Sequence, residues 1–314
     1  MRGLAAFAMG GRSRAMLMAM ASAGSLLFGW FSAALVALVT LRKGYGEGLI
    51  LLLWAALPAL LLIRVTGDST VLALILGTAA LALILRASMS LALTALASLA
   101  VALSTGALTL SLGGAMLEDL VRVFGEFIAT LEAQRTEAGV APLGMQTPTE
   151  LLLAGMLGTA NGALSFLCLI LARSWQAGLY NPGGFGREFR ALRFPPAIVL
   201  GLSAMAGALV ALGFDARSWA AAMLLPLTIA GFALLHAWSR QRGSSSFWMG
   251  SIYAAWMVFD AAKLALVGLV VADAALDLRR RWGYPGPDDR ESTEDHEHEP
   301  RTGPRDGRDD QDRE

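Results

Sequence analysis

Eight long apolar segments follow one another along this chain, and no other feature of the sequence limits the possible folds as strongly. A helix needs about 20 apolar residues to cross the hydrocarbon core of a bilayer. One such segment can be a buried helix of a soluble protein, but eight in succession leave too little polar surface for a fold that faces water. The sequence therefore predicts an all-α, polytopic transmembrane helical bundle. The segments are 15–41, 48–63, 70–85, 87–112, 148–172, 196–213, 216–236 and 246–278.

Charged residues are few and unevenly distributed. They make up 16% of the 314 residues, whereas soluble domains contain about 25%. Residues 1–282 contain 20 Lys and Arg against 13 Asp and Glu, and residues 283–314 contain 5 against 12. The second region also has almost no apolar residues, which is typical of disorder. We predict a transmembrane domain at 1–282 and a disordered acidic tail at 283–314.

The charges of the loops predict an orientation in the membrane. Residues 113–150 contain six acids and two arginines, whereas residues 173–195 contain four arginines and one glutamate. Cytoplasmic loops are enriched in Lys and Arg. We therefore expect a basic cytoplasmic loop at 173–195 and an outer amphipathic loop at 113–147, in the inner membrane of a bacterium.

Both termini are also expected in the cytoplasm, because Arg2, Arg12 and Arg14 precede the first segment and Arg279–Arg281 follow the last. This arrangement requires the first and last segments to break into short hairpins. Gly24 and Gly29 allow a break in the first. The alternative is that each segment crosses once and these clusters disobey the rule.

The outer loop has a helical pattern of its own. Its apolar residues share one face of a helix, with acids on the other face. Thr147 and Pro148 then predict the cap and first turn of the next helix. The apolar face consists of Leu117, Leu120, Val121, Phe124, Phe127, Ile128 and Leu131.

Three polar residues inside apolar segments form a candidate intramembrane polar site: Asn161, Asp260 and Lys263. Charges at bilayer depth are costly, so they are usually functional or paired. Asp260 and Lys263 are three residues apart and can pair on one helix, either as a solute or proton site or as a self-neutralising pair. Asn161 lies between Gly158 and Gly162, and this spacing predicts a close helix contact, with ligand binding as the alternative.

The basic loop carries the candidate residues for cytoplasmic docking or lipid binding. Its turn-rich centre precedes a short segment in which aromatic residues share a helical face beside three arginines, the pattern of a helix that lies on a membrane surface. A docking site for a partner or a phosphate-bearing ligand is the alternative. The candidates are Arg173, Trp175, Tyr180, Asn181, Pro182, Gly183, Gly184, Phe185, Arg187, Arg190 and Arg193.

No motif for catalysis or cofactor binding is found. The chain has no Gly-rich phosphate loop, HExxH helix or Gly-x-Ser-x-Gly elbow. The single cysteine, Cys168, lies in an apolar run, and two of the three histidines, His296 and His298, lie in the acidic tail. We expect no enzyme, no catalytic residue, no metal site and no cofactor.

The basic loop also resembles a known family. Leu171–Gln176, Leu179–Gly186 and Glu188–Arg193, together with Val39–Gly44 and Asp277–Arg281, are similar to the YybS-like family of bacterial polytopic membrane proteins of unknown function. The resemblance covers roughly residues 1–282. Such families have been grouped by fold with the substrate-binding components of energy-coupling-factor vitamin transporters. The resemblance thus implies a helical bundle that binds a small molecule and docks a partner.

Two functions follow as expectations. The first is a transport-related membrane protein, a solute-binding or permease-like subunit. The alternative is a non-transporting scaffold that docks partners through the basic loop and the acidic tail. The expected partners are the lipid bilayer and either a small-molecule solute or a membrane partner protein, and nucleic acid is not among them.

Overall fold

The computed structural model describes residues 10–243 and 246–282, and these ranges contain thirteen helices and no strand. The all-α class is therefore confirmed. Arg2 and the acidic tail at 283–314 lie outside the described residues. The helices are α2 (Arg12–Ala23), α3 (Gly29–Lys43), α4 (Tyr45–Thr66), α5 (Thr70–Ser88), α6 (Leu91–Leu112), α7 (Gly114–Glu137), α8 (Glu150–Tyr180), α9 (Gly184–Arg190), α10 (Pro196–Ala211), α11 (Arg217–Arg242), α12 (Ser246–Val258), α13 (Asp260–Leu276) and α14 (Leu278–Arg281).

Five of these helices are long and apolar enough to cross a membrane: α4, α5, α6, α8 and α11. The pair α12 and α13 would make a sixth if it is one span, but it is bent by 115°. The expected eight segments are not confirmed. The segment at 15–41 divides into the short helices α2 and α3, and α10 has only 16 residues.

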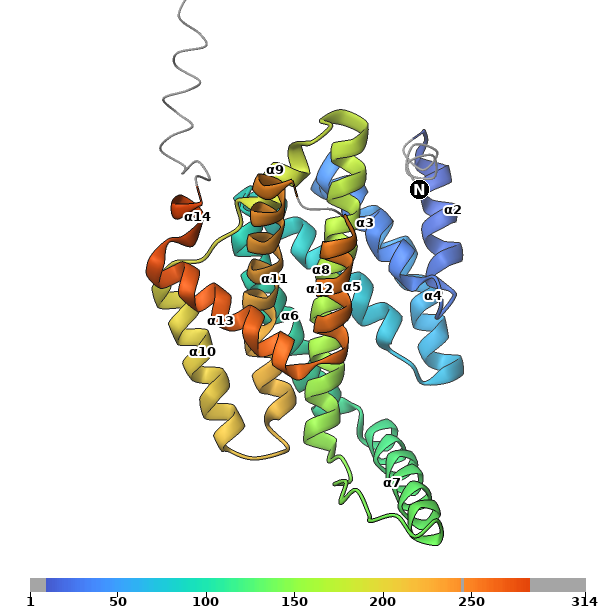
Figure 1. Ribbon diagram of the computed structural model, residues 1–314. Coiled ribbons are helices and arrows are strands. Elements are labelled where there is room, and N and C mark those ends of the chain that lie inside the picture. Colours follow the sequence, from blue (N-terminus) through green and yellow to red (C-terminus); the bar gives the residue numbers. More distant parts are fainter. Residues whose placement is uncertain (1–9, 244–245, 283–314) are drawn as a thin grey trace, which may run out of the picture.

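The helix α3 lies at the centre of the tightest part of the bundle. It packs against α2, α4, α5 and α8, and eleven of its fifteen residues are buried. Figure 1 shows α3 near α2, α4, α5 and the upper half of α8. Because most of its buried side chains are Ala, Val and Leu, the neighbouring helices approach closely from several sides.

The first apolar segment breaks between Ala23 and Gly29, and α2 and α3 pack against each other. Ser32 Oγ on α3 donates a hydrogen bond to Ala19 O on α2 at 2.9 Å. Arg12, at the start of α2, pairs with Glu47 near the start of α4. The two ends of this helical pair therefore lie at the same end of the bundle.

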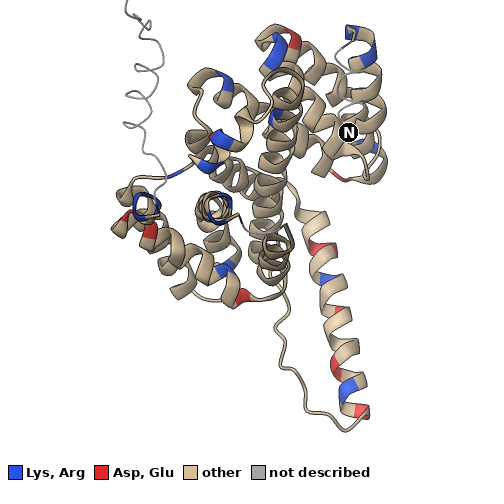
Figure 2. Ribbon diagram, turned by 45° about the horizontal axis from the view of Figure 1, so that its top comes forward, with Lys and Arg blue, Asp and Glu red and all other residues tan. Residues whose placement is uncertain are grey.

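Basic residues from distant parts of the sequence gather at that end, which we call the basic end. It is where α3, α5, α8 and α11 end and where α9 lies (Figure 1). Arg86 on α5 donates hydrogen bonds to Leu41 O (2.7 Å) and Thr40 O (3.3 Å) of α3. The Arg42 guanidinium lies 3.9 Å from the centre of the Tyr180 ring. Figure 2 shows most of the Lys and Arg positions on this part of the molecule, away from α7.

The last apolar segment also turns back toward the basic end. Its first half, α12, follows α11, which ends there at Arg242. After the 115° bend, α13 leads to Arg279. Arg279 donates hydrogen bonds to Arg190 O (2.7 Å) and Leu192 O (2.8 Å), beside α9.

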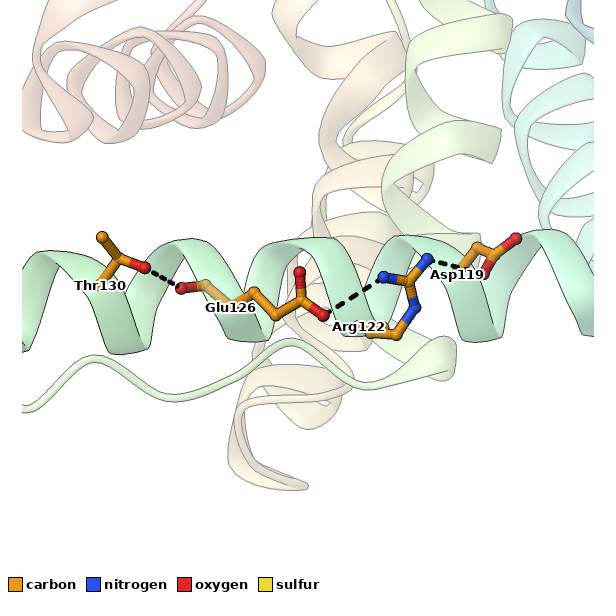
Figure 3. A network of polar contacts seen from close by, with 4 residues as sticks. All are labelled: Asp119, Arg122, Glu126 and Thr130. Atoms are coloured by element: carbon orange, nitrogen blue, oxygen red, sulfur yellow. Dashed lines mark hydrogen bonds and ion pairs between the residues drawn. The ribbon is translucent and has the colours of Figure 1, made fainter.

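The helix α7 projects from the opposite end of the bundle (Figure 1). It confirms the amphipathic helix expected from the sequence and buries only Leu117 and Ile128. On its polar side, Arg122 pairs with Asp119 (3.1 Å) and Glu126 (3.2 Å), one helical turn away on either side (Figure 3). These two hydrogen-bonded carboxylates raise the pKa of Arg122 above its ordinary value.

The helix α8 begins two residues later than its sequence predicts. Its N-cap is Thr149, whose hydroxyl accepts a hydrogen bond from Leu152 N at 3.2 Å, and not Thr147. The Thr149 hydroxyl also donates to Asp215 Oδ1 at 2.8 Å, in the turn before α11. The residue that caps α8 therefore also joins the start of α8 to the turn before α11.

Candidate functional site

Asn161 lies in the middle of α8 and joins three helices. Its Nδ2 donates a hydrogen bond to Thr105 Oγ1 on α6 at 2.9 Å and a longer one to Ala73 O on α5 at 3.5 Å. Interhelical hydrogen bonds of this kind stabilise an amide among apolar side chains. A cavity of about 240 Å³ lies beside the amide and is also lined by Trp30 and Met116. Asn161 thus holds helices together and faces a small cavity.

The glycines beside Asn161 confirm the predicted close helix contact. A Cβ atom at Gly158 would lie 2.4 Å from Ala102 O, and one at Gly162 would lie 2.7 Å from Ser98 O. Both carbonyls belong to the backbone of α6, which cannot move aside as a side chain can. Only glycine at these positions permits the present distance between α6 and α8.

Asp260 and Lys263 form an ion pair at the bend between α12 and α13. Lys263 Nζ lies 2.8 Å from Asp260 Oδ1, and the Asp260 side chain is 90% exposed. Asp260 is the first residue of α13, where a carboxylate interacts favourably with the helix dipole. Neither residue lines the cavity beside Asn161. The three residues of the predicted polar site are therefore divided between two separate places.

The first residues of the basic loop belong to α8, which extends to Tyr180. Arg173 pairs with Glu188 of α9 at 2.8 Å, so it fixes α9 to the end of α8. Trp175 is 3% exposed and packs edge-on against Phe31 of α3, with ring centroids 5.8 Å apart. Trp175 is therefore a core residue and not an anchor at the surface.

The turn at Asn181–Gly183 leads into α9, as its residues predict. Gly183 has a φ of +86°, a conformation in which a side chain would be strained. The rings of Phe185 and Phe189 then lie on one face of α9, 6.0 Å apart. This face packs against the bundle itself and not away from it. Arg187 remains exposed.

A larger cavity, of about 450 Å³, lies between α8, α9, α11 and α12. We call it the aromatic pocket. Phe232 of α11 stacks on Tyr253 of α12 (centroids 4.6 Å apart) and meets Trp256 edge-on (5.3 Å). His236 meets Phe189 edge-on (5.6 Å). The rings that line the pocket are Phe166, Phe185, Phe189, Phe232, His236, Tyr253 and Trp256.

Three nitrogen atoms on side chains that line the aromatic pocket are buried and have no hydrogen-bond partner among the described residues. They are His236 Nδ1 and the two N–H donors Arg190 Nε and Trp256 Nε1. A buried donor without a partner costs about 1–3 kcal/mol. No Asp or Glu is among the described residues that line the pocket, so the charge of Arg190 is not neutralised there.

The sequence did not predict this pocket, although Arg190 and Phe185 were among the candidates for cytoplasmic docking or lipid binding. The other aromatic residues of the pocket are nevertheless regularly spaced in the sequence. Phe232 and His236 are four residues apart on α11, and Tyr253 and Trp256 are three apart on α12, so each pair shares one helical face. What the spacing does not reveal is that the two faces meet.

A polar cavity of about 570 Å³ lies at the basic end, lined by Tyr45, Arg86, Arg173 and Glu188, among others. Its two arginines already have partners. Arg86 donates to two carbonyls of α3, and Arg173 pairs with Glu188. This cavity is therefore less suited to an anion than the aromatic pocket.

The described residues contain no group of three or more His, Cys, Asp or Glu side chains that could hold a metal ion. In comparisons with known proteins, no family model, no curated protein and no solved structure matches this chain.

Proposed function

We propose that this chain is a multi-pass protein of a bacterial inner membrane that binds a small amphipathic molecule in the aromatic pocket as part of transport. The observation that carries the proposal is the combination of a ring-lined cavity of about 450 Å³ with two unpartnered buried N–H groups. Ligand pockets have volumes of about 300–1,000 Å³ and combine apolar walls with a few polar groups.

The proposed orientation has the basic end in the cytoplasm. Support comes from the gathering of arginines from α3, α5, α8, α9 and α14 at one end of the bundle, because cytoplasmic ends are enriched in Lys and Arg. The pairs α2–α3 and α12–α13 then enter the membrane from the cytoplasm and return to it.

The resemblance to the YybS-like family agrees with this proposal, because it implies a helical bundle that binds a small molecule. The alternative function, a scaffold that docks a partner, is favoured by the exposed arginines Arg187, Arg240 and Arg242 at the basic end. A scaffold would need these surface charges and not the pocket.

The test is whether a small molecule co-purifies with the protein and depends on the pocket. Ala163→Phe adds a ring inside the aromatic pocket, whereas Ala160→Phe, one turn earlier on α8, adds the same ring beside Asn161. We expect mass spectrometry of the released ligand to detect an amphiphile with the wild type and Ala160→Phe, and much less with Ala163→Phe. Equal amounts from all three proteins would contradict the proposal.

The orientation is tested by cysteine labelling from the periplasmic side. Cys168 is buried, and Cys168→Ser removes the single native thiol. A cysteine at Arg135 of α7 should react with a membrane-impermeant reagent in intact cells, and one at Arg187 should not. Labelling of position 187 in intact cells would reverse the proposed orientation.

A further inference from the structure

The aromatic pocket is elongated, which restricts its ligand. Its wall on α11 extends from Leu225 to His236, and eleven residues of helix rise about 16 Å. Its wall on α8 extends from Ala163 to Ile170. An extended chain therefore fits this space better than a compact polar solute does.

The polar and apolar ends of the pocket are separated along its length. His236 lies near the end of α11 and contacts Phe189 of α9, so it marks the basic end of the pocket. Arg190 follows Phe189 and lines the same end. Leu225 lies more than two helical turns deeper on α11 and has only apolar or weakly polar neighbours along this wall.

The charge at the polar end favours an anion. Arg190 Nε is buried without a hydrogen-bond partner among the described residues. The acids nearest in the sequence and along α13 are engaged elsewhere: Glu188 with Arg173, Asp273 with Arg279, and Asp277 with Arg193. A carboxylate or phosphate would form a charge-assisted hydrogen bond with Arg190.

In the proposed membrane arrangement, the pocket also opens toward the lipid. Met257 of α12 and Leu167 of α8 both line it, and both are exposed. Since these residues lie within apolar helices, the opening leads toward the hydrocarbon region and not toward water. A ligand that is dissolved in the bilayer can enter directly.

We infer that the aromatic pocket binds a single-chain amphiphile with an anionic head group, with the chain along α11 and the head group at Arg190. This inference rests on the proposed function and adds the chemical class of the ligand. A fatty acid and a single-chain lipid phosphate share the chemistry that Arg190 recognises.

The test uses the purified full chain in detergent, titrated with three probes that have the same C16 chain: palmitate, hexadecyl phosphate and methyl palmitate. Binding is followed by native mass spectrometry at a fixed detergent concentration. We expect at least one of the two anions to bind about tenfold more tightly than the neutral ester, the ratio that one charge-assisted hydrogen bond provides. The preferred anion then identifies the head group.

The matched variants are Arg190→Gln and Arg187→Gln, both on α9. Arg187 is exposed and does not line the pocket. We expect Arg190→Gln to remove the preference for the anion, Arg190→Lys to restore part of it, and Arg187→Gln to retain it. Thermal unfolding of each variant checks that α9 remains folded.

Each contrary outcome has a separate meaning. Equal binding of the anions and the ester to the wild type overturns the inference and leaves the proposed function intact. An anion preference that Arg187→Gln removes and Arg190→Gln retains shows surface association and also overturns it. If no probe binds and no amphiphile co-purifies, both the inference and the proposed function fail.

Discussion

The contact between α6 and α8 and the contact between α11 and α12 join neighbouring helices by different means. In the first, Gly158 and Gly162 let two backbones approach so closely that a single added carbon would meet a carbonyl oxygen. In the second, rings do the packing, and Phe232 holds α12 through Tyr253 and Trp256. The first contact has no free space along its glycines, whereas the second borders the cavity of about 450 Å³.

This difference separates a closely packed part of the molecule from a part that contains a cavity. Close-packed backbones have many dispersion contacts and few alternative arrangements. A helix that is held by a few rings can shift without breaking a continuous interface. The glycines agree with this division: those of α12 and α13, Gly250 and Gly268, have open space around them.

The largest effect is expected from removing the residue that fastens α13 to the basic end. Arg279 is buried, pairs with Asp273 at 3.3 Å and donates to two backbone carbonyls beside α9. Arg279→Met would leave the mostly buried Asp273 carboxylate without its charged partner, and breaking a buried ion pair costs about 3–5 kcal/mol. We expect unfolding in detergent to occur at a markedly lower temperature. Arg280→Met, at the exposed neighbour, is the control and should change little.

A smaller loss is expected at the α6–α8 contact. Gly158→Ala places a methyl group against the backbone of α6, and overpacking of this kind costs about 1–3 kcal/mol. Gly268→Ala adds the same methyl group to α13, where nothing lies within 4 Å of it. Because alanine favours the helix over glycine by roughly 0.5–1 kcal/mol, this variant should be slightly more stable. Equal effects of the two substitutions on the free energy of unfolding would remove the distinction between the two contacts.

The amide of Asn161 should contribute less than the glycines beside it. Its hydrogen bond to Thr105 is measured by a double-mutant cycle of Asn161→Leu and Thr105→Val. Hydrogen bonds between transmembrane helices average about 0.6 kcal/mol in such cycles. A coupling near zero would mean that Asn161 serves the cavity beside it more than the packing of α6 on α8.

The smallest effect is expected at the bend in the loosely packed part. The Asp260 side chain is 90% exposed, so the ion pair with Lys263 is not enclosed by protein. Asp260→Asn and Lys263→Met should each leave the unfolding temperature nearly unchanged. A large loss in either single variant, with recovery in the double variant, would indicate that another chain covers this bend.

Much of the molecule could be predicted from local patterns. The amphipathic helix α7, the breaks in the first and last apolar segments, and the close approach at Gly158 and Gly162 all follow from residues near one another in the sequence. The number of spanning helices did not follow, because apolar composition alone does not reveal where a segment bends. The N-cap of α8 was predicted two residues too early, since Thr149 is selected together with a contact to Asp215.

The sequence by itself determined that this chain is a helical bundle with several helices long and apolar enough to span a membrane, because long apolar segments follow one another and charged residues are few. Only the tertiary structure decided where the side chains of the basic loop point. Trp175 is buried against α3, and Phe189 turns toward His236 of α11. The aromatic pocket needs four helices whose residues are up to 94 positions apart (Ala163 to Met257). Such contacts depend on how whole helices cross, and no local periodicity encodes that.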